Sequence, residues 1–516
     1  MGLFNRKSKP VTKEHRTASN DTAEKANGTN GTTPPPGTSN GVLPQYNHNN
    51  HEVTRGINPD GESGRKGFSP IHFLKITWRS SCTASRIVNV LWPFVPAAIA
   101  LHFVKGDHHL WTFAVNYIAM VPAANLLGFA GQEFARKLPS VAGIIIETML
   151  GGVVEIVLFM VLIAKDDGTG QPGHGNKILV IQAAILGSIL TNLLLCLGSC
   201  FLVGGMKHKE QKFHPAISEV GSGLLLVAGF ALLIPSAFFS SLSGSTVPEG
   251  QEGYTETLLR RDTQSISHGV SIILIISFLL YLVYNCVSHD NVFEEVLKAD
   301  ELADRDRHKD LRKAKLTMTE AIIAILISLT FISLIAVFLV AEIEYVVEHG
   351  VPDTFLGLIL VPLVEKAAEH ITTIDEAHDN QMNFALFHCL GPSLQTALFN
   401  APLVVIVGWG LHKPMDLNFE IFTVVLLVLS ILVVGNFLRD GSSNYLEGAL
   451  LVVSEIPDVK RFVAGSKLIL RCVKVVYVII AVTAYYYPNA ELTTSNGRAA
   501  AEGGETVEHA IRMLMH

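Results

Sequence analysis

Long apolar stretches alternate with short polar ones along most of this chain. A helix of roughly 20 apolar residues crosses the approximately 30 Å hydrocarbon core of a bilayer. Stretches of that kind lie at residues 86–104, 111–130, 139–164, 177–204, 217–239, 268–288, 317–341, 354–377, 384–410, 419–438 and, in broken form, 445–487. The pattern predicts an all-α polytopic membrane protein with about eleven transmembrane helices.

Two of these stretches carry acidic patches, and each patch has a polar partner in the next stretch. The patches are ETMLGGVVE at 147–155 and PLVEKAAEHITT at 362–373; the partners are GSILTN at 187–192 and GPSLQT at 391–396. After a lone first helix, five spans would follow in each half, so the halves would face opposite ways. Inverted repeats of this kind place a transport site near the membrane midplane.

The chain divides by composition into five parts. A polar, apolar-poor tail at 1–70 is expected to be disordered and cytosolic. The first helix and first repeat follow at 86–288, and the second repeat occupies 317–487, before a C-terminal tail at 488–516. Between the repeats, 289–316 predicts an amphipathic cytosolic helix with an apolar stripe of Phe293, Val296, Leu297 and Leu302, or else a solvated linker.

Composition and charge narrow the class of protein. The chain is 49% hydrophobic and 16% charged, which is typical of a membrane protein. Basic residues gather in the loops at 131–138, 205–216 and 289–316, so the positive-inside rule favours a cytosolic N-terminus. The net charge of −7 identifies no partner, and no basic, aromatic-interleaved patch suggests a nucleic acid.

Motif searches argue against other chemistries. The chain has no phosphate-cradling loop, so ATP-driven pumping is disfavoured, and neither an enzyme nor a resident cofactor is expected. The six cysteines lack the spacing of a metal site and are expected to be packing residues.

The first acidic patch predicts an ion site. A carboxylate at bilayer depth costs roughly 2.5–3.5 kcal/mol on insertion scales, so such residues usually mark ion or proton sites. Glu147, Gly151 and Glu155 share one helix face, and Gly151-Gly152 is expected to loosen that helix and free backbone carbonyls. We therefore predict Glu155 as a cation or proton ligand and Glu147 as a coupling residue.

The second acidic patch repeats this pattern. Glu365 and Glu369 are four residues apart, Lys366 and His370 lie on the neighbouring face, and Pro362 opens the carbonyl ladder one turn earlier. Hard cations such as Ca²⁺ require six to eight oxygens. Carboxylates also bind protons, so competition for one site is a simple basis for exchange. His370 is either a proton relay or a hydrogen-bonding residue between helices.

The partner stretches add small and oxygen-bearing side chains. Ser188, Asn192, Ser393 and Gln395 of these stretches, together with Gly151 of the first acidic patch, are the further expected cation ligands. Small and polar residues also serve ordinary helix packing in membranes. Their position beside the acidic patches favours the ligand role.

With these residues in place, the chain resembles the cation/proton exchanger family, and within it the fungal vacuolar Ca²⁺/H⁺ exchangers. The resemblance rests on Glu133 and on NVLWPFVPAAIA at 89–100, GSILTNLLLCLGSCFLVGG at 187–205, LLIPSAF at 232–238, AAEHITT at 367–373, LFNAPLVVIVGW at 398–409 and DGSSNYLEGALL at 440–451. It implies a vacuolar antiporter of Ca²⁺ and H⁺ with Glu155 and Glu369 as paired ligands. It also implies that Glu133 belongs to a proton pathway; the oligomeric state stays open.

The chain departs from the family pattern at the site itself. Gly152 replaces an Asn of the first motif, Glu365 and Lys366 replace Gly-Asn of the second, and Pro392 replaces a Ser. Lys366 is three residues before Glu369, within ion-pairing reach. Lys366 acting as an internal cation would suit an exchanger for Na⁺, K⁺ or Mn²⁺.

An alternative function is that of a non-transporting membrane sensor or scaffold that recruits partners through the tail and the linker.

Residues 454–476 split the last expected span and have no functional explanation. A retained intron or gene-model error would account for them.

Overall fold

The protein is helical over nearly all the residues that can be placed. The computed structural model describes residues 47, 49, 51–54, 56–104, 108–166, 176–247, 254–304 and 307–452. Within them, nine helices are long and apolar enough to cross a membrane. A tenth segment matches the predicted span at 354–377, and the eleventh begins at 445. The rest of the eleventh, with the insertion at 454–476, lies outside the described residues.

The N-terminal helices precede the repeats. Helix α1 (Pro70–Arg79) is followed by α2 (Thr83–Val88) and α3 (Phe94–Phe103). The last two form one membrane-length unit that is interrupted before Pro93, which has no N–H to donate. The predicted first span at 86–104 is therefore a broken helix.

The first repeat contains five long helical segments. They are α4 (His109–Ala135), α5 (Ser140–Lys165), α6 (Lys177–Leu190) with η3 (Thr191–Cys196) and α7 (Leu197–Lys207), α8 (Pro215–Ser243), and α9 (Glu256–Val283) with η4 (Tyr284–Ser288). Segments η3 and η4 are π-helical turns. They widen the helix locally without ending it.

The linker and the second repeat follow. They comprise α10 (Asp290–Ala303), α11 (Arg307–Arg312), α12 (Met318–Ala341), α13 (Ile343–Glu348), α14 (Asp353–Phe355) with η5 (Leu356–Leu360) and α15 (Val361–His378), α16 (Met382–Gln395) with η6 (Thr396–Asn400) and α17 (Ala401–Gly410), α18 (Ile421–Leu438) and α19 (Tyr445–Val452). A two-residue antiparallel ladder pairs β1 (Gln211–Lys212) with β2 (Ser442–Ser443).

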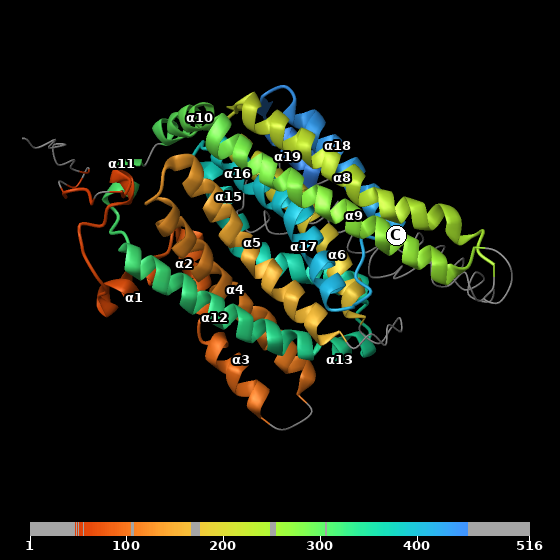
Figure 1. Cartoon of the computed structure of the whole chain (residues 1–516). Helices are drawn as coiled ribbons and strands as arrows, with labels where there is room; N and C mark the ends of the chain where they lie inside the picture. Colours follow the sequence, from red (N-terminus) through yellow and green to blue (C-terminus); the bar gives the residue numbers. More distant parts are fainter. Residues whose placement is uncertain are drawn as a thin grey trace, which may run out of the picture. The chain divides into compact units, whose positions relative to one another are not determined.

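The two repeats pack on one another with matching contacts. The first helices of the repeats, α4 and α12, lie side by side, as do the fourth helices, α8 and α18 (Figure 1). The third segment of each repeat packs on the fourth and fifth helices of the other: α6–α7 on α18 and α19, and α16–α17 on α8 and α9. Each contact thus occurs twice with the repeats exchanged, as expected for two related halves.

The third segment of each repeat is central. Of the most apolar part of α6–α7, 89% is buried, and of α16–α17, 78%, against 22% for α9. A helix that is apolar all round and enclosed by other helices belongs to the core of a bundle. Polar groups on these two segments are therefore held away from lipid.

Part of the expected N-terminal tail is packed against the bundle. Arg65 pairs with Glu320 at 2.9 Å, and the Asn58 N–H donates to the Lys137 carbonyl at 3.1 Å. Lys137 in turn donates through Nζ to the Gly61 carbonyl at 2.7 Å. The predicted disordered tail at 1–70 therefore extends too far, because residues 56–69 lie against the ends of α4 and α12. Residues 1–46 are outside the described residues.

Helix α10 confirms the amphipathic linker. Phe293, Val296 and Leu297 are buried, and the helix packs on α16, α5 and α8. Leu302 was wrongly placed in this apolar stripe, because its side chain is 72% exposed. At the inner face, Asp300 accepts hydrogen bonds from the Asn383 and Phe384 N–H groups and from the Asn383 side chain, at 2.7–3.1 Å. The linker is thus fastened to the first turn of α16.

Docking of α10 is expected to weaken as the pH rises. Burial raises the pKa of Asp300 from its usual 3.8 to about 6, although its hydrogen bonds to Asn383 and Phe384 act in the opposite direction. A carboxyl group whose pKa is raised in the folded protein stabilises the docked helix below about pH 4, and this stabilisation is lost as the pH rises through about 6. The difference between the two pKa values of Asp300 corresponds to at most about 3 kcal/mol. Hydrogen-exchange protection of α10, corrected for intrinsic rates, should fall between about pH 4 and 6. Asp300→Asn should remove that step, and an unchanged step would contradict this role.

Candidate functional site

The helices around the midpoint of the bundle are irregular at three places. The π-turns η3 and η6 interrupt the third segment of each repeat, and η5 ends directly before α15. Pro362 has no N–H for the Leu358 carbonyl, and that carbonyl lies against Gly187, where any Cβ would overlap it. The predicted irregularity at Pro362 is confirmed. The predicted loosening at Gly151-Gly152 is wrong, because α5 continues unbroken.

Glu155 of the first repeat is held by the second. Its side chain is fully buried, and its Oε2 accepts hydrogen bonds from Thr396 Oγ1 at 2.7 Å and Asn400 Nδ2 at 2.9 Å. Both donors belong to η6. Glu155 Oε1 has no hydrogen-bond partner among the described residues. One oxygen is therefore oriented by the protein, and the other is free to bind an ion or a proton.

Glu369 of the second repeat lies against the same helix. Its carboxylate touches Gly151, where a Cβ would overlap it. Lys366 donates to Glu369 Oε2 at 3.4 Å, and Lys366 is only 1% exposed. Since Gly151 is one turn before Glu155 on α5, the two glutamates approach one region, and each interacts electrostatically with Lys366.

Glu365 adds a third carboxylate. It is 2% exposed, and neither of its oxygens has a hydrogen-bond partner within the described part of the chain. It interacts electrostatically with Glu155, Lys366 and Glu369. When all are ionised, three carboxylates around one ammonium carry a formal charge of −3 + 1 = −2. One divalent cation, or two protons, would neutralise it.

Three predicted or nearby side chains have buried oxygens without hydrogen-bond partners in the described residues: Ser188 Oγ, Gln395 Oε1 and Asn400 Oδ1. Gln395 donates through Nε2 to the Met149 carbonyl at 3.3 Å, and its amide fills the space that a side chain at Gly152 would occupy. The departure at Gly152 thus makes room for the Gln395 amide beside α5.

Other predicted ligand residues form hydrogen bonds within their own helix or with a neighbouring helix. Ser393 donates through Oγ to the carbonyl of Cys389 on its own helix at 2.8 Å. Asn192 Oδ1 and His370 Nε2 form a hydrogen bond of 2.9 Å that joins η3 to α15. This contact is the helix-to-helix role that the sequence left open for His370.

Glu133 and Glu147 lie nearer the end of the bundle that carries α10. Glu133 accepts from Arg136 at 3.1 Å and from the Leu316 N–H at 2.7 Å, so the structure does not bring it to Glu155 or Glu369. Glu147 Oε1 is 3.6 Å from His388 Nε2, and His388 Nδ1 is 2.8 Å from Glu376 Oε2. An imidazole thus stands between one carboxylate of each repeat.

Two cavities extend from the cluster of Glu147, His388 and Glu376 to Glu369. The larger, of about 220 Å³, is bordered by charged residues of the tail, α10, α11 and α15, among them Asp60, Glu301, Arg307 and Glu376. The smaller, of about 40 Å³, is bordered by Gly151 and Glu369. Gln132, Glu147 and His388 line both cavities. We call the larger cavity the vestibule; these three residues form the wall that it shares with the smaller cavity.

Sequence reasoning missed Asn400 and His388 as site residues, and it counted Thr396 and Glu376 only as members of polar stretches without a role of their own. Thr396 and Asn400 are four residues apart, which is the spacing of one helix face and a usable signal. Glu376 and His388 belong to different helices, so no spacing indicated their contact.

The fold and site define a polytopic integral membrane protein built from two repeats around buried carboxylates. Residues 108–287 and 320–454 match the profile of the sodium/calcium exchanger protein family. The chain belongs to this family.

Similar proteins agree with that membership. A vacuolar cation/proton exchanger 2 of Oryza sativa subsp. japonica is 31% identical over 385 residues, which cover 73% of this chain and 82% of the relative. A Ca²⁺/H⁺ antiporter of Synechocystis sp. is 31% identical over 381 residues, covering 72% and 95%. The solved structure of native YfkE has a TM-score of 0.57 at 25% identity and covers 78% of this chain and 100% of that one.

Proposed function

We propose that this protein is a secondary active antiporter that exchanges Ca²⁺ for H⁺, with Glu155 and Glu369 as alternating cation and proton ligands. The observation that carries the proposal is the group of three carboxylates and one ammonium, contributed by both repeats, with its formal charge of −2; Glu155, Glu365 and Lys366 are buried and Glu369 is partly exposed. The relatives named as a cation/proton exchanger and a Ca²⁺/H⁺ antiporter support the same substrates.

The oxygens around Glu155 suit a hard cation. Ca²⁺ takes six to eight oxygens at 2.3–2.6 Å. Glu155 Oε1 and Glu369 would supply charge, and the neutral oxygens of Ser188, Gln395 and Asn400 would complete the shell. Backbone approach at Gly151 lets the Glu369 carboxylate come close to α5. Thr396 and Asn400 orient Glu155 for this role, while Ser393 and Asn192 are proposed to stabilise the surrounding helices.

Protons and Ca²⁺ would compete for the same carboxylates. A protonated carboxyl loses the charge that attracts the cation, so each substrate excludes the other. Two half-sites on oppositely oriented repeats allow this exchange to occur from either side as the repeats rock against each other. No bound nucleotide is needed, since the proton gradient supplies the free energy.

The two cavities provide a route from the vestibule. Acidic residues at its mouth, such as Asp60 and Glu301, would concentrate cations, and Glu147 with Glu376 would receive them. His388 holds these two carboxylates together and lies between vestibule and ion site. We assign Glu147 and Glu365 to proton or ion coupling, whereas His370 is assigned to the contact between η3 and α15, and Glu133 lines neither cavity.

Lys366 favours a second candidate function. The Lys366 ammonium lies 3.4 Å from Glu369, and its positive charge lowers the negative charge that is available to bind Ca²⁺. With Lys366 as a permanent internal cation, the site would instead exchange Na⁺, K⁺ or Mn²⁺ for protons.

We place the protein in the vacuolar membrane with its N-terminus in the cytosol. The named vacuolar relative supports the membrane. The end of the bundle that carries the tail, α10 and the vestibule also carries Arg65, Arg136, Lys137 and Lys315, which favours a cytosolic position under the positive-inside rule.

Reconstituted vesicles test the function. Purified protein is placed in vesicles with an acidic interior and a pH-sensitive dye, and Ca²⁺ is added outside. Proton release that depends on Ca²⁺ and is saturable is expected, and Na⁺, K⁺ and Mn²⁺ should compete weakly. Stronger release with one of those cations would favour the second candidate. No release with any of them would contradict antiport.

A further inference from the structure

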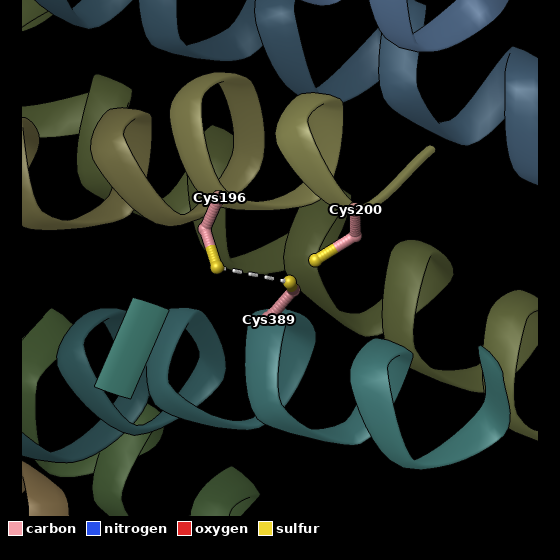
Figure 2. Close-up of side chains that lie close together, drawn as sticks. All are labelled: Cys196, Cys200 and Cys389. Carbon is pink, nitrogen blue, oxygen red and sulfur yellow. Dashed lines mark hydrogen bonds between the residues drawn. The ribbon is translucent and has the colours of Figure 1, made fainter. Parts of the chain in front are cut away.

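Three cysteines that the sequence predicted to be packing residues lie close together in the structure. Cys196, Cys200 and Cys389 are fully buried, and their sulfur atoms all lie within 4.8 Å of one another. Cys196 Sγ and Cys389 Sγ are 3.5 Å apart. Figure 2 shows the side chains of Cys196 and Cys200 directed from one helical segment toward Cys389 on the facing helix.

The cluster joins the two repeats. Cys196 ends η3 and Cys200 belongs to α7, both in the third segment of the first repeat, whereas Cys389 belongs to α16 in the second. These are the two most enclosed segments of the bundle. A bond that bridged the sulfurs would therefore fix the repeats relative to each other.

Ordinary packing explains single buried cysteines, which behave as small apolar residues. It does not require three thiols from two segments to meet. Thiolate sulfur is a soft ligand that selects Cu⁺, Zn²⁺ and similar ions over Ca²⁺. The imidazoles of His370 and His388 lie close enough to interact electrostatically with Cys196.

We propose that Cys196, Cys200 and Cys389 form a binding site for one thiophilic metal ion, and that an ion bound there inhibits exchange by tying the third segments of the repeats together. On binding a divalent ion, three S–H groups each lose a proton to water and three metal–sulfur bonds form. His388, which directly precedes Cys389 on α16, lines both cavities.

The inhibitory part of the proposal rests on the proposed function, whereas the binding part does not. Two separate measurements therefore test them. Cd²⁺ is the probe in both, because sulfur-to-Cd²⁺ charge transfer absorbs in the ultraviolet and reports sulfur ligands, but not the carboxylates of the transport site.

Binding is measured on the purified full-length protein in detergent with reductant removed. One equivalent of Cd²⁺ is expected to produce the charge-transfer band. Cys389→Ser should weaken binding by at least about tenfold, as should Cys196→Ser. The matched control is Cys82→Ser with Cys286→Ser and Cys472→Ser, which should bind as the natural protein does. A missing band, or equal binding by Cys389→Ser, would overturn the site.

Inhibition is measured in the vesicles. Cd²⁺ should block Ca²⁺-dependent proton release from the natural protein and from the control variant, and Cys389→Ser should resist. Equal block of Cys389→Ser would indicate competition at the carboxylates and overturn the inhibitory role. A chelator should restore transport. Recovery with dithiothreitol but not with a chelator would indicate a disulfide and overturn metal binding. Absence of transport with an intact band would count against the proposed function alone.

Discussion

Replacing Glu155 by glutamine is expected to lower Ca²⁺-dependent proton release by at least 100-fold. Glu155 is fully buried, and its Oε2 is already committed to Thr396 and Asn400, so the charge at Oε1 is the part available to a cation. A glutamine preserves the shape but removes the charge that both substrates need. Losing one partner of a buried charged pair costs roughly 3–5 kcal/mol, which corresponds to a factor of more than about 100.

The matched control is Glu256→Gln, the same change at a side chain that is 61% exposed at the start of α9. It should transport normally, and gel filtration of both variants should match the natural protein. Glu155→Asp, which keeps the charge but shortens the side chain, should retain part of the activity. Undiminished exchange by Glu155→Gln would exclude Glu155 from the site.

Replacing Lys366 by asparagine should change which cation is carried. Lys366 is buried 3.4 Å from Glu369 and also interacts with Glu155 and Glu365. A unit charge about 4 Å away is worth about 4 kcal/mol at an effective dielectric constant of 20. Without that positive charge the three carboxylates attract a divalent ion more strongly. The apparent affinity for Ca²⁺ should rise by at least about tenfold, and the pH dependence of exchange should shift.

Lys366→Arg keeps the charge and serves as the control, with selectivity close to that of the natural protein. Proton release is measured with Ca²⁺ alone and in competition with Na⁺, K⁺ and Mn²⁺ across a pH series. If Lys366→Asn leaves both selectivity and pH dependence unchanged, Lys366 has no part in the mechanism. The second candidate function, exchange of Na⁺, K⁺ or Mn²⁺ with Lys366 as an internal cation, is then excluded.

The helical spans and the duplication were predictable because both depend on local properties of the chain. A segment such as 177–204 is apolar over a membrane thickness whatever surrounds it. The acidic patches around Glu155 and Glu369 stood out for the same reason, since carboxylates are costly in such segments. The conformation of the helix that carries Glu155 was predicted incorrectly. Gly151-Gly152 suggested a loosened turn, but α5 is unbroken, and the two glycines instead leave space for the side chains of Glu369 and Gln395.

The sequence alone determined which segments span the membrane, in which order, and which two carboxylates belong to the proposed ion site. Both the length of an apolar segment and the presence of a charged residue within it can be read from the local sequence. Only the tertiary structure decided which groups meet. Asn400 reaches Glu155, His388 stands between Glu147 and Glu376, and three cysteines converge, all across repeats and over separations that no local pattern encodes. The physical reason is that the second and third segments of one repeat pack against those of the other, and this packing, not spacing along the chain, brings these side chains together.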